Sequence, residues 1–201
     1  MIAAMTKEHL AGVTRLHRAN VSGLLQRLGE TAILAYYRGA QTSGLAVGHV
    51  YLHEGAVAGF VFGSVHPDRL NRAVLRANPI GVLGGIVVGI TTAPSSLVWL
   101  LKSLSGPPSG AFDPRIPELT YLATDPAHRG QGIGERLVES FNVSLRGQGV
   151  VAYELSVDDD NAAGIGFYEK LGFRPIGRYR EFGTEHRRYR IELAVTPGAR
   201  A

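Results

Sequence analysis

The sequence of 201 residues contains no cysteine, and this absence excludes several kinds of site at once. Without a thiol the chain can form no disulfide, cannot bind zinc through cysteine, and has no cysteine nucleophile. It also lacks any run of consecutive basic residues longer than the Arg187–Arg188 pair, although its formal net charge is +4. Nucleic-acid binding is therefore not expected, and the positive charge suits a small anionic ligand better.

A secretory signal and a membrane span are not expected either. The first residues show no basic segment followed by a long apolar stretch. The run Ala77–Leu101 carries no charged residue and is long enough to cross a bilayer, but prolines and glycines interrupt it. We expect instead a helical insertion, with one helix over Ser95–Leu104 starting just after Pro94. This favours a cytoplasmic protein without a membrane partner, and a membrane-attached protein is the alternative.

A glycine-rich turn lies between an apolar run and a helical pattern in the second half of the chain. The apolar run is Leu119–Thr124 and the helical pattern is Glu135–Arg146. A strand, a glycine-rich turn and a helix in this order present bare backbone N–H groups to an anion. Arg129 adds a permanent cation at the same place. Three glycines leave the N–H groups open to a pyrophosphate, Gly130, Gly132 and Gly134.

The spacing within this turn separates the common pyrophosphate loops. A dinucleotide fingerprint needs a third glycine where Glu135 stands, and a Walker loop needs a lysine that the turn lacks. The segment Arg129–Gly134 reads Arg-Gly-Gln-Gly-Ile-Gly, and it resembles the acyl-CoA pyrophosphate loop of the GNAT superfamily of N-acetyltransferases. A plain helix start is the alternative interpretation.

A second block about thirty residues further on supports this resemblance. Val150–Val157 is rich in β-branched and aromatic residues and predicts a strand. Asn161–Leu171 predicts a helix with an asparagine N-cap, and Gly172 stands at the C′ position, where a left-handed residue is preferred. The string from Asn161 to Phe173 is similar to the second GNAT signature, with Gly164 in the place of its small residue.

The resemblance implies a fold for the whole chain. We expect a single domain over residues 1–201 in the α/β (α+β) class, with a mixed, mostly antiparallel central sheet flanked by helices. The first half agrees with this by its order of strand, helix, helix, strand and strand. Residues 67–117 would form an apolar helical insertion between the third and fourth strands, and residues 196–201 a flexible tail.

The resemblance also implies acetyl-CoA as co-substrate, an amine acceptor and no metal. In the strand that matches the family's, residues 122–124, the backbone would bind the pantetheine arm and stabilise the oxyanion. Thr124, where the family often has valine, should therefore be harmless. Asn161 could contact the cofactor or simply cap its helix. The implied cofactor-binding residues are Leu122, Ala123, Thr124, Arg129, Gly130, Gln131, Gly132, Ile133, Gly134, Asn161 and Tyr168.

Two catalytic residues follow from the same resemblance. Tyr168 matches the tyrosine that protonates the departing thiolate, and Glu118 begins the strand that often carries the base. His66, at the end of the third strand, is a rival base because its ordinary pKa suits the task. The expected reaction is direct attack of a primary amine of a small molecule on acetyl-CoA in a ternary complex.

Other functions stay open at this point. A non-catalytic CoA-binding module would have the same loop, and a longer-chain acyl-CoA N-acyltransferase would have the same chemistry. The apolar insertion could cover the amine site, hold a hydrophobic acceptor or acyl chain, or form the contact of a homodimer.

Overall fold

The computed structural model describes residues 1–104, 113, 115–181 and 183–194. The proposed tail 196–201 and part of the insertion therefore lie outside the described residues. In chain order, the described strands are β1 (Ile2–Ala4), β2 (Ala46–His53), β3 (Ala56–Ser64), β4 (Glu118–Thr124), β5 (Ala152–Asp158), β6 (Arg174–Glu181) and β7 (Thr184–Glu192).

These strands form one sheet in the order β1-β2-β3-β4-β5-β7-β6. Every neighbouring pair is antiparallel except β4 and β5, which run parallel. This confirms the expected mixed, mostly antiparallel sheet flanked by helices. β3 and β5, in the interior of the sheet, are buried at most positions, because helices cover both faces there.

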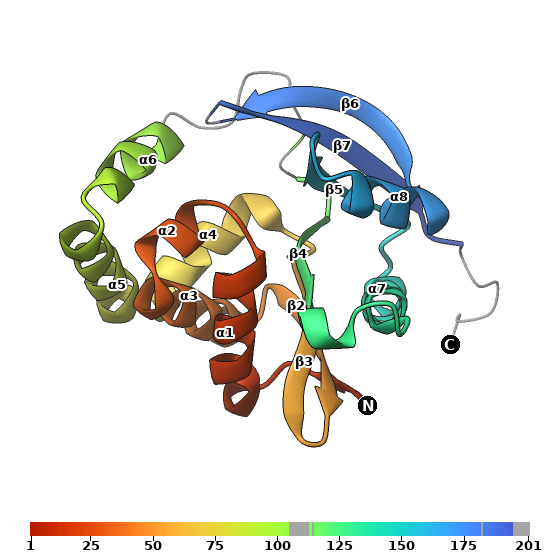
Figure 1. The fold of residues 1–201 in the computed structure, drawn as a ribbon, viewed down its shortest axis with the longest axis horizontal. Coiled ribbons are helices and arrows are strands. Elements are labelled where there is room, and N and C mark those ends of the chain that lie inside the picture. The colour runs from red at the N-terminus through yellow and green to blue at the C-terminus, as the bar shows by residue number, and fades with distance from the viewer. Residues whose placement is uncertain (105–112, 114, 182, 195–201) are drawn as a thin grey trace.

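The described helices cover both faces of the sheet. α7 (Ile133–Gly147) and α8 (Ala162–Lys170) pack on one face, around a core that includes Leu137, Phe141 and Tyr153. On the other face lie α1 (Leu10–Asn20), α2 (Leu24–Leu28) and α3 (Glu30–Ser43), after the short 3-10 turn Lys7–His9. Figure 1 shows the sheet between these two groups of helices.

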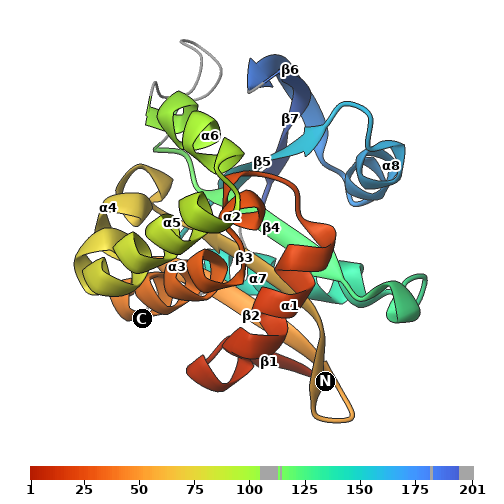
Figure 2. The same cartoon turned by 60° about the vertical axis from the view of Figure 1, so that its left-hand side comes forward.

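Three further helices lie between β3 and β4 in the sequence. They are α4 (Pro67–Ala77), α5 (Pro79–Thr92) and α6 (Ser95–Leu104), and they pack beside α2 and α3, on the side away from α7 (Figures 1 and 2). No single helix of the described residues is long and apolar enough to cross a membrane. α4 and α5 pass that test only as a pair, which is bent by 95°.

Two irregularities of β4 prepare the site. Gly63 of β3 pairs with Leu119, whereas the preceding Phe62 pairs with Tyr121, so Thr120 is the extra residue of a β-bulge. The bulge changes the face to which the following side chains point. β4 and β5 then pair at a single register position, Glu118 with Glu154, and the remainder of the two strands is not paired.

Candidate active site

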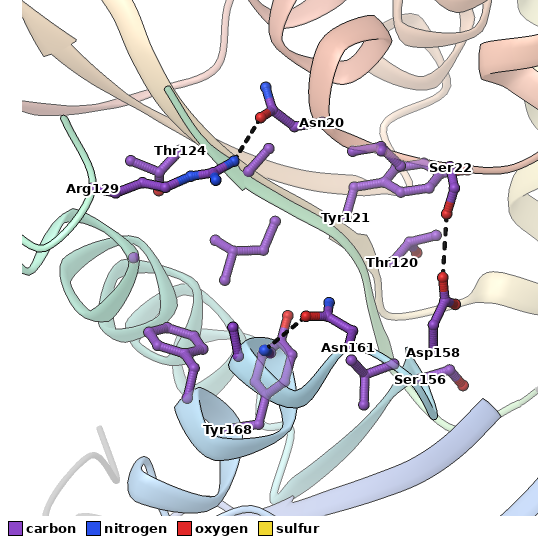
Figure 3. A pocket seen from close by; sticks show the side chains of 18 of the residues that line it. Asn20, Ser22, Thr120, Tyr121, Thr124, Arg129, Ser156, Asp158, Asn161 and Tyr168 are labelled. Carbon is purple, nitrogen blue, oxygen red and sulfur yellow. Dashed lines mark hydrogen bonds between the residues drawn. The ribbon is translucent and has the colours of Figure 1, made fainter. Parts of the chain in front are cut away.

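A cavity of about 770 Å³ lies where β4 and β5 are no longer paired. Its walls come from residues 120–124 of β4 and 156–158 of β5, with the glycine turn and α8 on one side. The segment Asn20–Ser22, at the C-terminal end of α1, forms part of the opposite side. Figure 3 shows this arrangement, with Arg129 close to Asn20 and with Asn161 and Tyr168 across the cavity from them.

The glycine turn opens into this cavity, which Gly130, Gly132 and Gly134 line. Gly130 and Gly132 have φ angles of +75° and +72°, in the left-handed region that favours glycine. α7 begins directly afterwards at Ile133, so its first N–H groups have no partner within the helix. These N–H groups and the positive end of the helix dipole form a site for an anion such as phosphate.

Basic side chains surround the same end of the cavity. Arg129 lines it and donates from Nη2 to Oδ1 of Asn20 at 2.8 Å. Lys170 also lines it and pairs with Glu135, with 2.7 Å between Nζ and Oε1. Gln131, in contrast, is exposed and is not among the lining residues. The loop therefore turns its backbone and Arg129 to the cavity, and the side chain of Gln131 faces solvent.

The open edge of β4 forms the wall between the two ends of the cavity. Leu122, Ala123 and Thr124 all line it, and they pair with β3 on one side only. Because β5 pairs with β4 only at Glu118, the β5-facing backbone groups of this stretch have no strand partner in the described part of the chain. Such an edge can pair with an extended amide-containing ligand.

Tyr168 enters the cavity from α8. Its ring packs against Phe167 and Phe173, with centroid distances of 5.2 and 5.4 Å. Its hydroxyl makes no hydrogen bond to any described residue, which leaves it available to a ligand. Burial raises the pKa of Tyr168 well above its ordinary value, so the hydroxyl carries its proton at neutral pH.

Asn161 has two functions that do not exclude each other. Its Oδ1 accepts a hydrogen bond from the N–H of Gly164 at 2.9 Å, which makes it the N-cap of α8. It also lines the cavity. The capping role that the sequence suggested is therefore present, and the side chain is still in reach of a ligand.

Glu118 lies next to the cavity but is not one of its lining residues. Its Oε1 accepts from Nη1 of Arg188 at 3.0 Å, and the Nε of the same arginine donates to Oε2 of Glu154 at 2.9 Å. Burial raises the pKa of Glu118, and the nearby Arg188 opposes this effect only in part. His66 is exposed before α4 and does not line the cavity.

Several cavity residues escaped the sequence analysis. At the end away from the glycine turn, Asp158 accepts from Ser22 Oγ at 3.3 Å and pairs with His186, with 3.0 Å between Oδ1 and Nδ1. Glu181 also lines the cavity and forms no ion pair with any described residue. This end is therefore rich in carboxylates, whereas the glycine turn is basic. Within the described ranges no cluster of metal-ligating side chains occurs.

Comparison with known sequences gives short local matches. The chain is 35% identical over 66 residues to a mycothiol acetyltransferase of Beutenbergia cavernae, which covers 33% of this chain and 22% of that protein. It is 37% identical over 65 residues to the N-alpha-acetyltransferase RimI of Mycobacterium tuberculosis, or 32% of this chain and 39% of that protein. The chain thus spans well under two thirds of the length of these curated relatives.

Comparison with solved structures extends over nearly the whole chain. The structure of yncA from Salmonella typhimurium with its cofactor acetyl-CoA superposes with a TM-score of 0.60 at 16% identity, over 100% of this chain and 98% of that one. The ribosomal-protein-S18-alanine N-acetyltransferase of Escherichia coli gives 0.58 at 16% identity, with the same coverage. At this identity the likeness concerns the fold.

A family model adds the sequence evidence that the structures lack. The model described as the acetyltransferase (GNAT) family matches residues 13–173, which include the glycine turn, the open edge of β4 and Tyr168. The chain therefore belongs to the GNAT family of acetyltransferases.

Proposed function

We infer that this protein transfers the acetyl group of acetyl-CoA to a primary amine of a small molecule, by direct attack within a ternary complex. The observation that carries the proposal is one cavity that joins an anion-binding loop, an open strand edge and a protonated tyrosine. Acetyl-CoA supplies the acyl group as a reactive thioester. The family's known use of this cofactor agrees with the residues present.

The chain offers residues for each requirement of the transfer. The N–H groups of the turn Arg129–Gly134 bind the pyrophosphate, and the free edge of β4 pairs with the pantetheine arm. A backbone N–H of the same edge stabilises the negative charge that develops on the carbonyl oxygen. As the new C–N bond forms and the C–S bond breaks, Tyr168 donates its proton to the departing sulfur.

The amine must also lose a proton, and Glu118 is the candidate base that the structure favours. Its raised pKa makes it a stronger base than an ordinary glutamate. Since it stands behind the cavity wall, the proton would reach it through water. The exposed His66 is less suitable, whereas Glu181 lines the cavity and is a second candidate.

The charge distribution supports an amine acceptor. Asp158 and Glu181 lie at the end away from the phosphate-binding turn, and Glu118 and Glu154 lie just behind it. Asp158 already pairs with His186, and Glu118 and Glu154 pair with Arg188, so Glu181 is the carboxylate among these that pairs with no described residue and can attract a protonated amine. A non-catalytic CoA-binding module would not need such a carboxylate, so we favour the enzyme. A longer acyl chain is the second candidate.

Calorimetric binding of CoA and acetyl-CoA tests the cofactor, with Gly132→Glu as the disabled variant. A glutamate there requires a strained backbone and places a negative charge where phosphate would bind. Gly149→Glu is the matched control, because Gly149 has the similar φ of +76° on open surface beyond α7. We expect wild type and control to bind, and Gly132→Glu to lose binding.

Release of free thiol from acetyl-CoA then tests the transfer. A chain without cysteine contributes no thiol background to this assay. Amine-dependent release supports the enzyme, whereas CoA binding without release for any amine would favour the non-catalytic module. Failure of the folded wild type to bind either ligand would overturn the proposal as a whole.

A further inference from the structure

The helices between β3 and β4 expose an apolar face that the cavity does not use. Ile80 of α5 is 87% exposed, and Val87, two turns further along the same side of the helix, is 60% exposed. Isolated apolar side chains on a surface are ordinary, but a contiguous group of them marks an interaction site. The described part of the chain gathers most of its exposed large hydrophobic residues here, namely Leu75, Ile80, Leu83, Val87, Val88, Leu97, Val98 and Leu101.

α5 turns its small residues toward the protein and its large apolar residues outward, unlike an ordinary surface helix. Its glycines point inward: a Cβ on Gly85 would lie 2.7 Å from the Cα of Ala32, and one on Gly89 would lie 2.6 Å from the carbonyl oxygen of Leu28. These close approaches fix α5 against α3 and α2. The branched aliphatic side chains are consequently left on the outside, where a water-facing helix would carry charge.

No charged residue interrupts this apolar face, but basic residues border it. Ala77–Leu101 contains no Asp, Glu, Lys or Arg. Just before it, α4 exposes Arg72 and Arg76, which are four residues apart and so lie on one side of the helix beside Leu75, and neither arginine forms an ion pair with a described residue. On the other side, the guanidinium of Arg27 stacks on Trp99 of α6 at 3.9 Å.

We propose that α4, α5 and α6 bind the surface of an anionic lipid bilayer. An apolar helix face bordered by arginines and a tryptophan is the pattern of a helix that lies in the membrane interface. α5, at about 21 Å, is shorter than the hydrocarbon layer and is packed along one side on α3, so it lies on the membrane rather than across it. The proposal does not depend on acyl transfer.

A second copy of the chain fits this surface less well. A two-fold contact brings the same patch together from both copies. The apolar segment offers no carboxylate to the arginines of the partner copy, and Asp68, the acidic residue of α4, already pairs with Arg69. Anionic headgroups, in contrast, would pair with Arg72 and Arg76. Charge complementarity therefore favours lipid.

Sedimentation with vesicles tests the proposal on the full chain. We expect binding to phosphatidylcholine vesicles in which about a third of the lipid is phosphatidylglycerol, and weak binding to phosphatidylcholine alone. The double variant Leu83→Ser, Val87→Ser should lower the partition coefficient at least about tenfold, because two aliphatic side chains no longer enter the interface. The variant Arg72→Gln, Arg76→Gln should bind anionic vesicles more weakly and with a smaller dependence on salt, because two of the bordering charges are removed.

The matched control is Val143→Ser, Val151→Ser, which removes two aliphatic side chains that are each 56% exposed elsewhere. It should bind vesicles like the wild type. Circular dichroism and the urea midpoint establish that each variant is folded. No vesicle binding by the wild type would overturn the proposal, as would equal losses in test and control variants. A dimer that Leu83→Ser, Val87→Ser converts to a monomer, without vesicle binding, would instead assign the face to a second copy.

Discussion

Arg188 of β7 reaches across β5 to Glu118 of β4, with 3.0 Å between Nη1 and Oε1. On the way it also binds Glu154 of β5, so one guanidinium joins three strands. The arginine side chain is 2% exposed and that of Glu118 is 19% exposed. The same contact therefore connects the stability of the sheet to the proposed catalytic base.

Substitution of Arg188 should be strongly destabilising. Arg188→Gln removes the cation that lies between the carboxylates of Glu118 and Glu154, and leaves Glu154 only its longer contact of 3.5 Å with Arg190. Removal of one partner from a buried ion pair costs about 3–5 kcal/mol. Urea unfolding at pH 7 measures this, with Arg18→Gln as control, since that arginine pairs with Glu30 on the exposed surface. A loss as small as that of the control would show that the buried network does not stabilise the fold.

Glu118→Gln should reduce the rate and alter its pH dependence. Burial raises the pKa of Glu118, so in the wild type the rate should fall as the pH decreases through a value above the ordinary glutamate pKa. The base is active only when deprotonated, which gives the fall its direction. In the variant we expect a rate about 100-fold lower, without this acidic limb.

Initial rates of thiol release across the pH range measure this effect, with the exposed Glu8→Gln as control. Glutamine retains the hydrogen bond from Arg188, so the fold should be preserved. An unchanged rate and an unchanged limb in Glu118→Gln would exclude it as the base and direct attention to Glu181.

Tyr168→Phe should separate catalysis from binding. Phenylalanine keeps the ring contacts with Phe167 and Phe173 and removes only the hydroxyl. We expect kcat to fall about 100-fold while the affinity for CoA changes by less than about twofold. Calorimetry and steady-state rates measure the two quantities, with Tyr51→Phe on β2 as control. Equal kcat values in wild type and variant would remove the acid role.

The parts of the site that the sequence predicted are contiguous in the chain. The turn Arg129–Gly134 has a local signature, because its left-handed glycines and the helix that follows are neighbours in sequence. Asn161 and Tyr168 come from a second local signature, on α8. Short-range patterns of this kind need no knowledge of the sheet order.

The parts that were missed depend on long-range contacts. Ser22 and Glu181 line one cavity although they lie far apart in the sequence, and only the strand order places them together. The bulge at Thr120 arises from pairing with β3 and has no signature of its own. The direction in which α5 faces was also not predictable, because a helix that is apolar all round gives no indication of its buried side.

His17 provides a test of the core beneath the cavity. It is buried in α1, where it is within hydrogen-bond distance of the Tyr37 hydroxyl, at 2.8 Å, and its ring packs against Tyr121 at 4.7 Å. Burial lowers the pKa of His17 from 6.5 to about 4. The unfolded chain therefore binds a proton at a higher pH than the folded chain does, and the free energy of unfolding should decrease as the pH falls from about 6.5 towards 4.

The substitution His17→Gln should reduce this dependence on pH, because glutamine does not titrate and can still bond to Tyr37. In the wild type, the pKa shift of His17 corresponds to a decrease of about 2 kcal/mol in the free energy of unfolding between pH 7 and pH 5. Urea unfolding at both pH values measures the difference, and the smaller shift of His49 contributes equally to both proteins. The variant starts less stable at pH 7 but should lose less on acidification. Parallel losses in the two proteins would mean that His17 titrates normally and is accessible to water in the folded state.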